Sequence, residues 1–212
     1  MIVINFKNYK LGNKALDLAK KIQKYLPQAI IAIPSTEISP IAKKTRLKIY
    51  AQHVSPYKKR RATGFDLPQA IKIAGASGTL LNHSEHKISM KEIKEAINIC
   101  HSLSLKTIVC TSNLQETKKI LPMRPYAIEF EDSELVGSGK SITKYKSKDV
   151  AKFSFLLKKT RIIPLCGAGI SSAEDIKQAN SLGCKGVLIS SAIANVKNPS
   201  FLLKQIASLK TK

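Results

Sequence analysis

The chain has 212 residues, with 36 lysines and arginines against 14 aspartates and glutamates, which gives a net charge of +22 at pH 7. This length suits one domain with a full core, while no apolar run approaches the roughly 20 residues of a membrane span. Four widely spaced cysteines without a Cys-x-x-Cys pair exclude a disulfide framework and a cysteine-based metal centre. With no signal-peptide pattern at the start, we expect a cytoplasmic protein.

The basic charge is spread along the predicted helices and is not gathered with aromatic residues. Phe, Trp and Tyr together make up 6% of the chain, too few and too scattered for a surface that stacks nucleic-acid bases. We therefore expect a solvated basic surface and no nucleic-acid partner. The run Lys58-Lys59-Arg60-Arg61 is a candidate local anion patch, with a solvated charge run as the alternative.

Eight short apolar runs alternate with helical patterns along the whole chain. The predicted strands cover residues 2–6, 29–33, 48–52, 78–81, 106–110, 126–131, 162–166 and 186–190. Eight such units of about 26 residues predict an α/β fold, a compact (β/α)8 barrel with short helices, as one domain over residues 1–212. An open, doubly wound sheet is the alternative, but the first turn, residues 5–9, lacks the glycines typical of that fold.

Polar side chains follow several of these strands, at the end where such a barrel gathers its active site. They are Asn5 and Lys7 after the first strand, Asn82, His83 and Glu85 after the fourth, and Glu129 and Glu131 in the sixth. Small residues follow the seventh and eighth strands, at 166–171 and 190–192, where backbone amides and helix N-termini can bind a phosphate. A glutamate, a histidine and a lysine beside a phosphate site predict proton transfer next to a carbonyl, with no metal or organic cofactor.

At this point the chain resembles the triosephosphate isomerase family, in its short archaeal form. The resemblance covers nearly the whole chain and is carried by Asn5-Phe6-Lys7, Gly78-Thr79-Leu80-Leu81-Asn82-His83-Ser84-Glu85, Gly137-Ser138-Gly139, Cys166-Gly167-Ala168-Gly169-Ile170-Ser171 and residues 186–192. It implies a TIM barrel that interconverts dihydroxyacetone phosphate and D-glyceraldehyde 3-phosphate through an enediolate. This aldose–ketose isomerisation belongs to glycolysis and gluconeogenesis, and the family implies a homodimer or homotetramer.

The resemblance also implies roles for individual residues. Lys7 and Asn5 would bind substrate, and His83 would be the electrophile, in the pairing of a glutamate base with a neutral histidine that is established for this family. The base lies six residues before the first glycine of the Gly137-Ser138-Gly139 segment, which selects Glu131. Glu129 would then be a structural or supporting carboxylate on the same strand face.

Further roles follow for the loops. The amides of Val136, Gly169, Ser190 and Ser191 would bind the phosphate, and residues 132–139 would close over the substrate. Glu85 would fix Lys7. Ser84 would support the loop after the fourth strand, with a helix cap as the alternative. The remaining histidines have no counterpart among the family's catalytic residues and are expected to be structural; they are His53, His86 and His101.

Two departures from the family pattern bear on these expectations. Asp132 replaces the proline that usually follows the base, which removes a rigid hinge and adds a negative charge. The four cations at 58–61 lie in the loop that reaches a neighbouring subunit in the family, with Thr63 nearest the partner's site. Another phosphosugar barrel, such as an epimerase, is the competing enzyme, and a barrel that binds RNA through its charge is the non-enzyme alternative.

Overall fold

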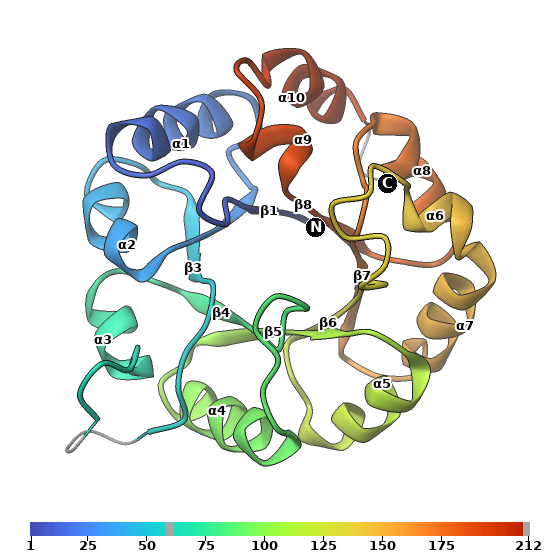
Figure 1. Cartoon of the computed structure of the whole chain (residues 1–212), viewed down its shortest axis with the longest axis horizontal. Helices are drawn as coiled ribbons and strands as arrows, with labels where there is room; N and C mark the ends of the chain where they lie inside the picture. Colours follow the sequence, from blue (N-terminus) through green and yellow to red (C-terminus); the bar gives the residue numbers. More distant parts are fainter. Residues whose placement is uncertain (58–61, 210–212) are drawn as a thin grey trace.

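The computed structural model describes residues 1–57 and 62–209, so the basic run at 58–61 lies outside the described residues. Eight parallel strands close into a barrel in chain order, and helices surround it (Figure 1). The strands are β1 (Ile2–Asn5), β2 (Ile30–Ile33), β3 (Lys48–Ala51), β4 (Gly78–Leu81), β5 (Lys106–Thr111), β6 (Ala127–Phe130), β7 (Ile163–Cys166) and β8 (Gly186–Ile189). The (β/α)8 prediction is confirmed with every strand end within one residue, and the open-sheet alternative is wrong.

The helices are short, with between 4 and 13 residues each. They are α1 (Asn13–Tyr25), α2 (Ser35–Ala42), α3 (Pro68–Ile73), α4 (Met90–Ser102), α5 (Leu114–Ile120), α6 (Ile142–Tyr145), α7 (Ser147–Leu157), α8 (Ala173–Ser181), α9 (Ser191–Ala194) and α10 (Ser200–Ala207), with a 3-10 turn at Leu121–Met123. Ser89 begins α4 and Ser172 begins α8, each through a capping box. Within residues 1–57 and 62–209, no helix has the length and apolar character to cross a bilayer.

The core has two layers, one inside the barrel and one between the strands and the helices. Nine buried side chains fill the inner layer: Val3, Ile30, Ala32, Tyr50, Leu80, Ile108, Ala127, Leu165 and Leu188. A larger apolar cluster joins the outer faces of the strands to the helices. Since each strand is buried on both faces, its sequence reads as a continuous apolar run, which explains why the strands were predictable.

Three strands end in a sharp, strained turn. Lys7, Asn82 and Ala168, which follow β1, β4 and β7, have φ angles of 45°, 59° and 69°. Residues with a Cβ rarely adopt this left-handed conformation, and when they do the site is often functional. Two others of this kind, Ser104 and Arg124, follow helical turns. The strained turns thus mark the carboxyl end of the barrel as the end that carries the site.

Candidate active site

A cavity of about 350 Å³ opens at the carboxyl ends of the first four strands. It is lined by side chains from the loops that follow β1 to β4: Asn5, Lys7, Asn8, Pro34, Ser35, Gln52, His53, Asp66, Leu80, His83, Glu85 and His86. The structure therefore brings together four of the predicted site residues, Asn5, Lys7, His83 and Glu85, around one space of metabolite size.

Lys7 is held at both its backbone and its side chain. Its N–H donates to Asn5 Oδ1 at 3.0 Å, and its Nζ lies 2.6 Å from Glu85 Oε1. Gln52 Nε2 donates to the Lys7 carbonyl at 2.9 Å and to Asn5 Oδ1 at 3.2 Å. These contacts stabilise the strained turn and fix the ammonium group at the cavity. Gln52 was not predicted as a site residue, although the segment 51–54 also resembles the family.

His83 is a buried, neutral imidazole whose proton can be assigned from its contacts. The residue is 7% exposed, and burial lowers the pKa of His83 below its usual value, which outweighs the opposing effect of the Glu131 charge. The Glu85 backbone N–H donates to His83 Nδ1 at 3.1 Å, so Nδ1 is the acceptor nitrogen. The single proton of the neutral ring then lies on Nε2. His83 Nε2 is 3.5 Å from Glu131 Oε2, so this N–H lies next to the carboxylate.

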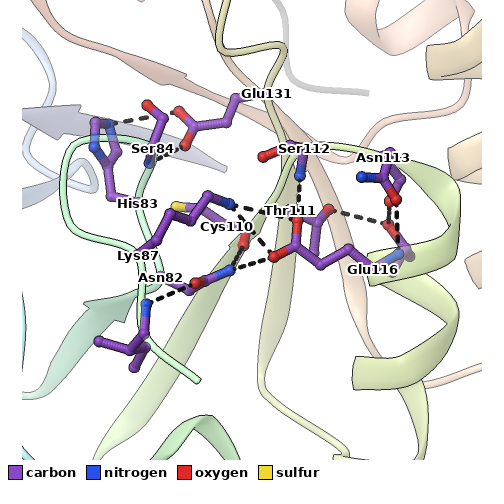
Figure 2. Close-up of polar contacts among 12 residues, drawn as sticks. Asn82, His83, Ser84, Lys87, Cys110, Thr111, Ser112, Asn113, Glu116 and Glu131 are labelled. Atoms are coloured by element: carbon purple, nitrogen blue, oxygen red, sulfur yellow. Dashed lines mark hydrogen bonds and ion pairs between the residues drawn. The ribbon is translucent and has the colours of Figure 1, made fainter. Parts of the chain in front are cut away.

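Glu131 follows β6 and is 1% exposed. Its Oε1 accepts the backbone N–H of Ser84 at 2.6 Å, and its own N–H donates to the Thr111 carbonyl at 2.9 Å. Figure 2 shows the carboxylate directed at Ser84 and His83. A short hydrogen bond from a backbone amide stabilises the charged form of a carboxylate.

Ser84 contributes through its backbone. Its hydroxyl is buried without a hydrogen-bond partner among the described residues. Ser89, five residues later, is the residue that begins α4. The alternative that Ser84 is only a helix cap is therefore wrong.

A second network braces the loop that carries His83 (Figure 2). The Asn82 amide donates to Glu116 Oε1 at 2.7 Å, and Asn82 Oδ1 accepts the Ile88 N–H at 3.1 Å. Glu116 Oε2 in turn accepts the N–H of Ser112, just after β5, at 2.7 Å. The left-handed turn at Asn82 is thus tied to the neighbouring strand. The sequence did not indicate Glu116, since it lies in α5 far along the chain.

Glu129 points the same way as Glu131 but has a different environment. It is fully buried, and neither carboxylate oxygen has a hydrogen-bond partner among the described residues. Burial, and then the charge of Glu131, raises the pKa of the Glu129 carboxyl well above its usual value of 4.5. Cys110 Sγ and one carboxylate oxygen from each glutamate lie within 4.8 Å of one another. Among the described residues, these three side chains could hold a metal ion. Proton transfer needs no metal, and we assign no metal site here.

The predicted phosphate-binding residues lie on the loops after β6, β7 and β8. The Val136 N–H donates to the Asp132 carbonyl at 3.2 Å, inside its own loop. Gly169, with φ 67°, lies so close to the Lys140 carbonyl that a Cβ would come within 2.0 Å of that oxygen. Ser190 Oγ donates to the Asn5 carbonyl at 2.9 Å, which ties β8 to β1, and Ser191 begins α9.

Asp132, at the start of the predicted closing loop, has its charge paired. Its Oδ2 lies 3.2 Å from Lys146 Nζ, and its Oδ1 accepts the Glu134 N–H at 2.9 Å. Leu135 N–H also donates to the Asp132 carbonyl at 3.0 Å. The loop is therefore wound into tight turns about Asp132.

His53 and His86 also line the cavity, although the sequence did not indicate this. Their rings stack with centroids 4.1 Å apart. Burial, with a smaller contribution from His86, lowers the pKa of His53 from 6.5 to about 4. The His53 ring is thus a neutral wall of the cavity at neutral pH.

Comparisons with known proteins agree with this geometry. The sequence model of the triosephosphate isomerase family matches residues 1–209. The chain is 36% identical to a triosephosphate isomerase of Sulfolobus acidocaldarius, covering 94% of this chain and 90% of that one, and 35% identical to that of Methanocaldococcus jannaschii, covering 97% and 98%. The crystal structure of triosephosphate isomerase from Bartonella henselae matches with a TM-score of 0.76 over 97% of this chain and 96% of that one, at 18% identity, which supports the fold.

Proposed function

The chain belongs to the triosephosphate isomerase family, and on that premise we propose which of its residues carry out the isomerisation. It interconverts dihydroxyacetone phosphate and D-glyceraldehyde 3-phosphate, a step of glycolysis and gluconeogenesis. The reaction moves a proton between two neighbouring carbons through an enediolate. A base, a donor to the oxygen that gains charge, and a phosphate site are the parts that it requires.

Glu131 is the proposed base. It takes the proton from the carbon beside the substrate carbonyl and returns it to the neighbouring carbon. The 2.6 Å hydrogen bond from Ser84 N–H to Glu131 Oε1 supports this role, since it fixes the position of the carboxylate and leaves Oε2 for the proton. The proximity of this carboxylate to His83 Nε2, at 3.5 Å, is the single observation that carries the proposal.

His83 and Lys7 are proposed to stabilise the enediolate. The neutral His83 ring offers Nε2–H to the substrate oxygens, and a donor placed in advance costs no rearrangement during the reaction. Lys7 Nζ supplies a positive charge at the same cavity, and its 2.6 Å contact with Glu85 fixes its position. Asn5 supports both the Lys7 turn and the substrate.

The phosphate is proposed to bind the backbone amides of Val136, Gly169, Ser190 and Ser191. Val136 can do so only if its N–H leaves the Asp132 carbonyl, so residues 132–139 must rearrange when substrate binds. This rearrangement is the closure expected from the sequence, and it would shield the enediolate from water. The positive net charge of the chain would attract the dianionic substrate.

We also propose a cytoplasmic homo-oligomer, a dimer or a tetramer, built from one catalytic domain over residues 1–212, with no nucleic-acid partner. Two features support assembly and location. Tyr57 and Phe65, which are 43% and 49% exposed, have tilted rings with centroids 4.5 Å apart near Thr63 and offer an apolar contact. All four cysteines are free and buried, as in a reducing compartment.

The test is turnover of D-glyceraldehyde 3-phosphate by the unaltered protein, Glu131→Gln and Glu129→Gln, at low and moderate salt. We expect Glu131→Gln to lower kcat by about 10²- to 10⁴-fold, the usual contribution of a general base. Glutamine keeps the shape and still accepts the Ser84 N–H, so such a loss reports the base and not a collapsed site. Equal losses in both variants would contradict the choice of Glu131, and no turnover in the folded, unaltered protein would contradict the residue roles altogether.

A further inference from the structure

Glu129 is the buried group that the mechanism above leaves unused. It lies on β6 two residues before the base, so both side chains point into the barrel. Strand register places it beside Cys110 of β5 and Leu165 of β7. Around it the interior is apolar, and Leu80, Leu165 and Leu188 belong to that layer.

The space around its carboxyl group is closed on every side. A Cβ on Gly167 would lie 1.9 Å from Glu129 Oε1 and 3.5 Å from Leu188 Cβ. The carboxyl thus fills the gap left by a glycine, against the backbone that follows β7. Neither oxygen has a geometric hydrogen-bond partner among the described residues, and the donor beside it is the thiol of Cys110, which is a weak one.

The charges that face this carboxyl come from several elements. The titratable neighbours are Cys110 on β5, Glu131 after β6, Lys87 in the loop after β4, and Cys184 before β8; Cys166 on β7 is itself affected by Glu129. Lys87 Nζ lies 3.4 Å from Glu116, so its charge is already paired. Burial raises the pKa of Cys110 well above its usual value, so Cys110 is a neutral thiol.

The two glutamates therefore differ in the neighbouring groups that can stabilise a negative charge on the carboxyl. Glu131 Oε1 accepts the backbone N–H of Ser84 at 2.6 Å, and Glu131 Oε2 lies 3.5 Å from His83 Nε2. Glu129 has neither, and it lies against a second carboxylate. Burying an ionised carboxylate without hydrogen-bond donors is strongly unfavourable, so such a group stays protonated and uncharged.

We propose that Glu129 keeps its proton at neutral pH and thereby leaves Glu131 as the single negative charge beside the substrate. Glu129 is a positioning residue that acts through the base. An ionised Glu129 would make Glu131 take up a proton more readily and would repel the enediolate that forms above it. Two carboxyl groups on one strand face thus have separate roles because only one of them is given hydrogen-bond donors.

This inference rests on the proposed role of Glu131, but its first test needs no turnover. We would measure the unfolding equilibrium constant by urea titration from pH 4.5 to pH 8 for the unaltered protein and for Glu129→Gln. The folded protein holds a proton that the unfolded chain releases above pH 4.5, so stability is present at low pH and is lost as pH rises. The unfolding constant of the unaltered protein, relative to Glu129→Gln, should rise about tenfold per pH unit until Glu129 ionises in the folded state.

The matched control is Glu95→Gln on the exposed side of α4, which reports any general effect of changing a carboxyl to an amide. A purely structural role for Glu129 would give a difference between the two proteins that does not change with pH. If the ratio of the unfolding constants of the unaltered protein and Glu129→Gln does not change with pH, the proposal is overturned. Infrared difference spectra at pH 8 give a second readout: we expect the C=O band of a protonated acid that Glu129→Gln removes, and its absence would also overturn the proposal.

The pH dependence of kcat/KM then tests the action on the base. If Glu129 is uncharged, Glu129→Gln removes no charge, and the acid limb of the profile stays at the same pH whatever happens to kcat. A shift of that limb to lower pH by one unit or more would show that Glu129 carried a negative charge beside Glu131, which would overturn the proposal. Failure of the residue roles would instead appear as undiminished turnover in Glu131→Gln with the stability slope intact.

Discussion

The two sides of the barrel mouth differ in how completely they are built. On the side of β1, β3 and β4, Lys7 and His83 are already fixed by contacts from Glu85, and the backbone of Ser84 on this side holds the carboxylate of Glu131, which reaches it from the end of β6. On the side of β6 and β7, the loop 132–139 is folded on itself, and the Val136 N–H is occupied by the Asp132 carbonyl. The groups that move protons are in place before substrate, whereas a group that would bind phosphate is not.

This difference has a physical reason. Stabilising a transient charge is effective only when the donors need no reorganisation, which favours a rigid proton-transfer side. Phosphate is a remote part of the substrate, so its binding energy can be used to drive a loop closed over the reacting carbons. Changes on the first side should lower kcat, and changes on the second side should raise KM. The following variants test that division.

Among these variants, the largest effect is expected for His83→Leu, on the rigid side. Leucine offers no donor in place of the Nε2–H, and loss of one such donor lowers kcat by about 10²- to 10³-fold. KM should change little, because the phosphate contacts are untouched. Steady-state kinetics with D-glyceraldehyde 3-phosphate measures both constants. His53→Leu, in the same cavity, is the control, and an equal fall in kcat there would contradict the assignment.

A smaller effect, mainly on KM, is expected for Gly169→Ala, on the phosphate side. The new Cβ would lie 2.0 Å from the Lys140 carbonyl oxygen, and the residue would keep a φ of 67° that alanine tolerates poorly. The backbone must shift, which moves a proposed phosphate donor, and we expect KM to rise about tenfold with a smaller fall in kcat. Competitive inhibition by inorganic phosphate should weaken as well, with an inhibition constant that rises in parallel with KM. A fall in kcat alone would break the division between the two sides.

A further, smaller effect is expected for Lys146→Met, which removes the ion pair with Asp132 at 3.2 Å. The pair is partly exposed and such pairs contribute little, so the equilibrium of the loop should shift by about fivefold at most. KM and kcat should both change within that limit, because loop closure affects both. Lys144→Met, on the neighbouring helix α6, is the matched control. A change beyond fivefold would indicate that Asp132 does more than hold the open loop.

Much of the fold was predictable because its strands are buried on both faces. Continuous apolar runs such as residues 78–81 and 186–190 can be read without knowing their neighbours, and turns with small residues mark where they end. The caps at Ser89 and Ser172 are local features of the same kind, since each capping box lies within four residues of sequence. Local patterns therefore yielded the elements, and their regular alternation yielded the barrel.

The supports of the site could not be predicted in that way. Gln52 and Glu116 act on residues 45 and 34 positions away, so only the closed barrel brings them into contact. The same holds for Ser84, whose backbone and not its hydroxyl contacts Glu131. The environment of Glu129 depends on Gly167, which follows the neighbouring strand β7 and is 38 positions away in the chain. Residue types predicted the chemistry, while the charges and proton positions required the surrounding strands.

The last prediction concerns stability and not turnover, and it tests whether the rigid side depends on a neutral wall. Burial lowers the pKa of His53 from 6.5 to about 4, so between these values the unfolded chain binds a proton that the folded protein does not. Stability is therefore complete above pH 6.5 and falls as pH is lowered toward 4. In His53→Asn this part of the acid dependence disappears, and thermal unfolding midpoints should fall less steeply from pH 6.5 to 4 than in the unaltered protein.

Some acid dependence should remain in that variant, because burial also lowers the pKa of His83, which acts in the same direction. His101→Asn, at the exposed end of α4, is the control and should follow the unaltered protein. If His53→Asn and the unaltered protein lose stability in parallel, the stacked pair of His53 and His86 accepts a proton without cost. The rigid side would then tolerate a charge in its wall, and the fixed positions of Lys7 and His83 would have to rest on their hydrogen bonds alone.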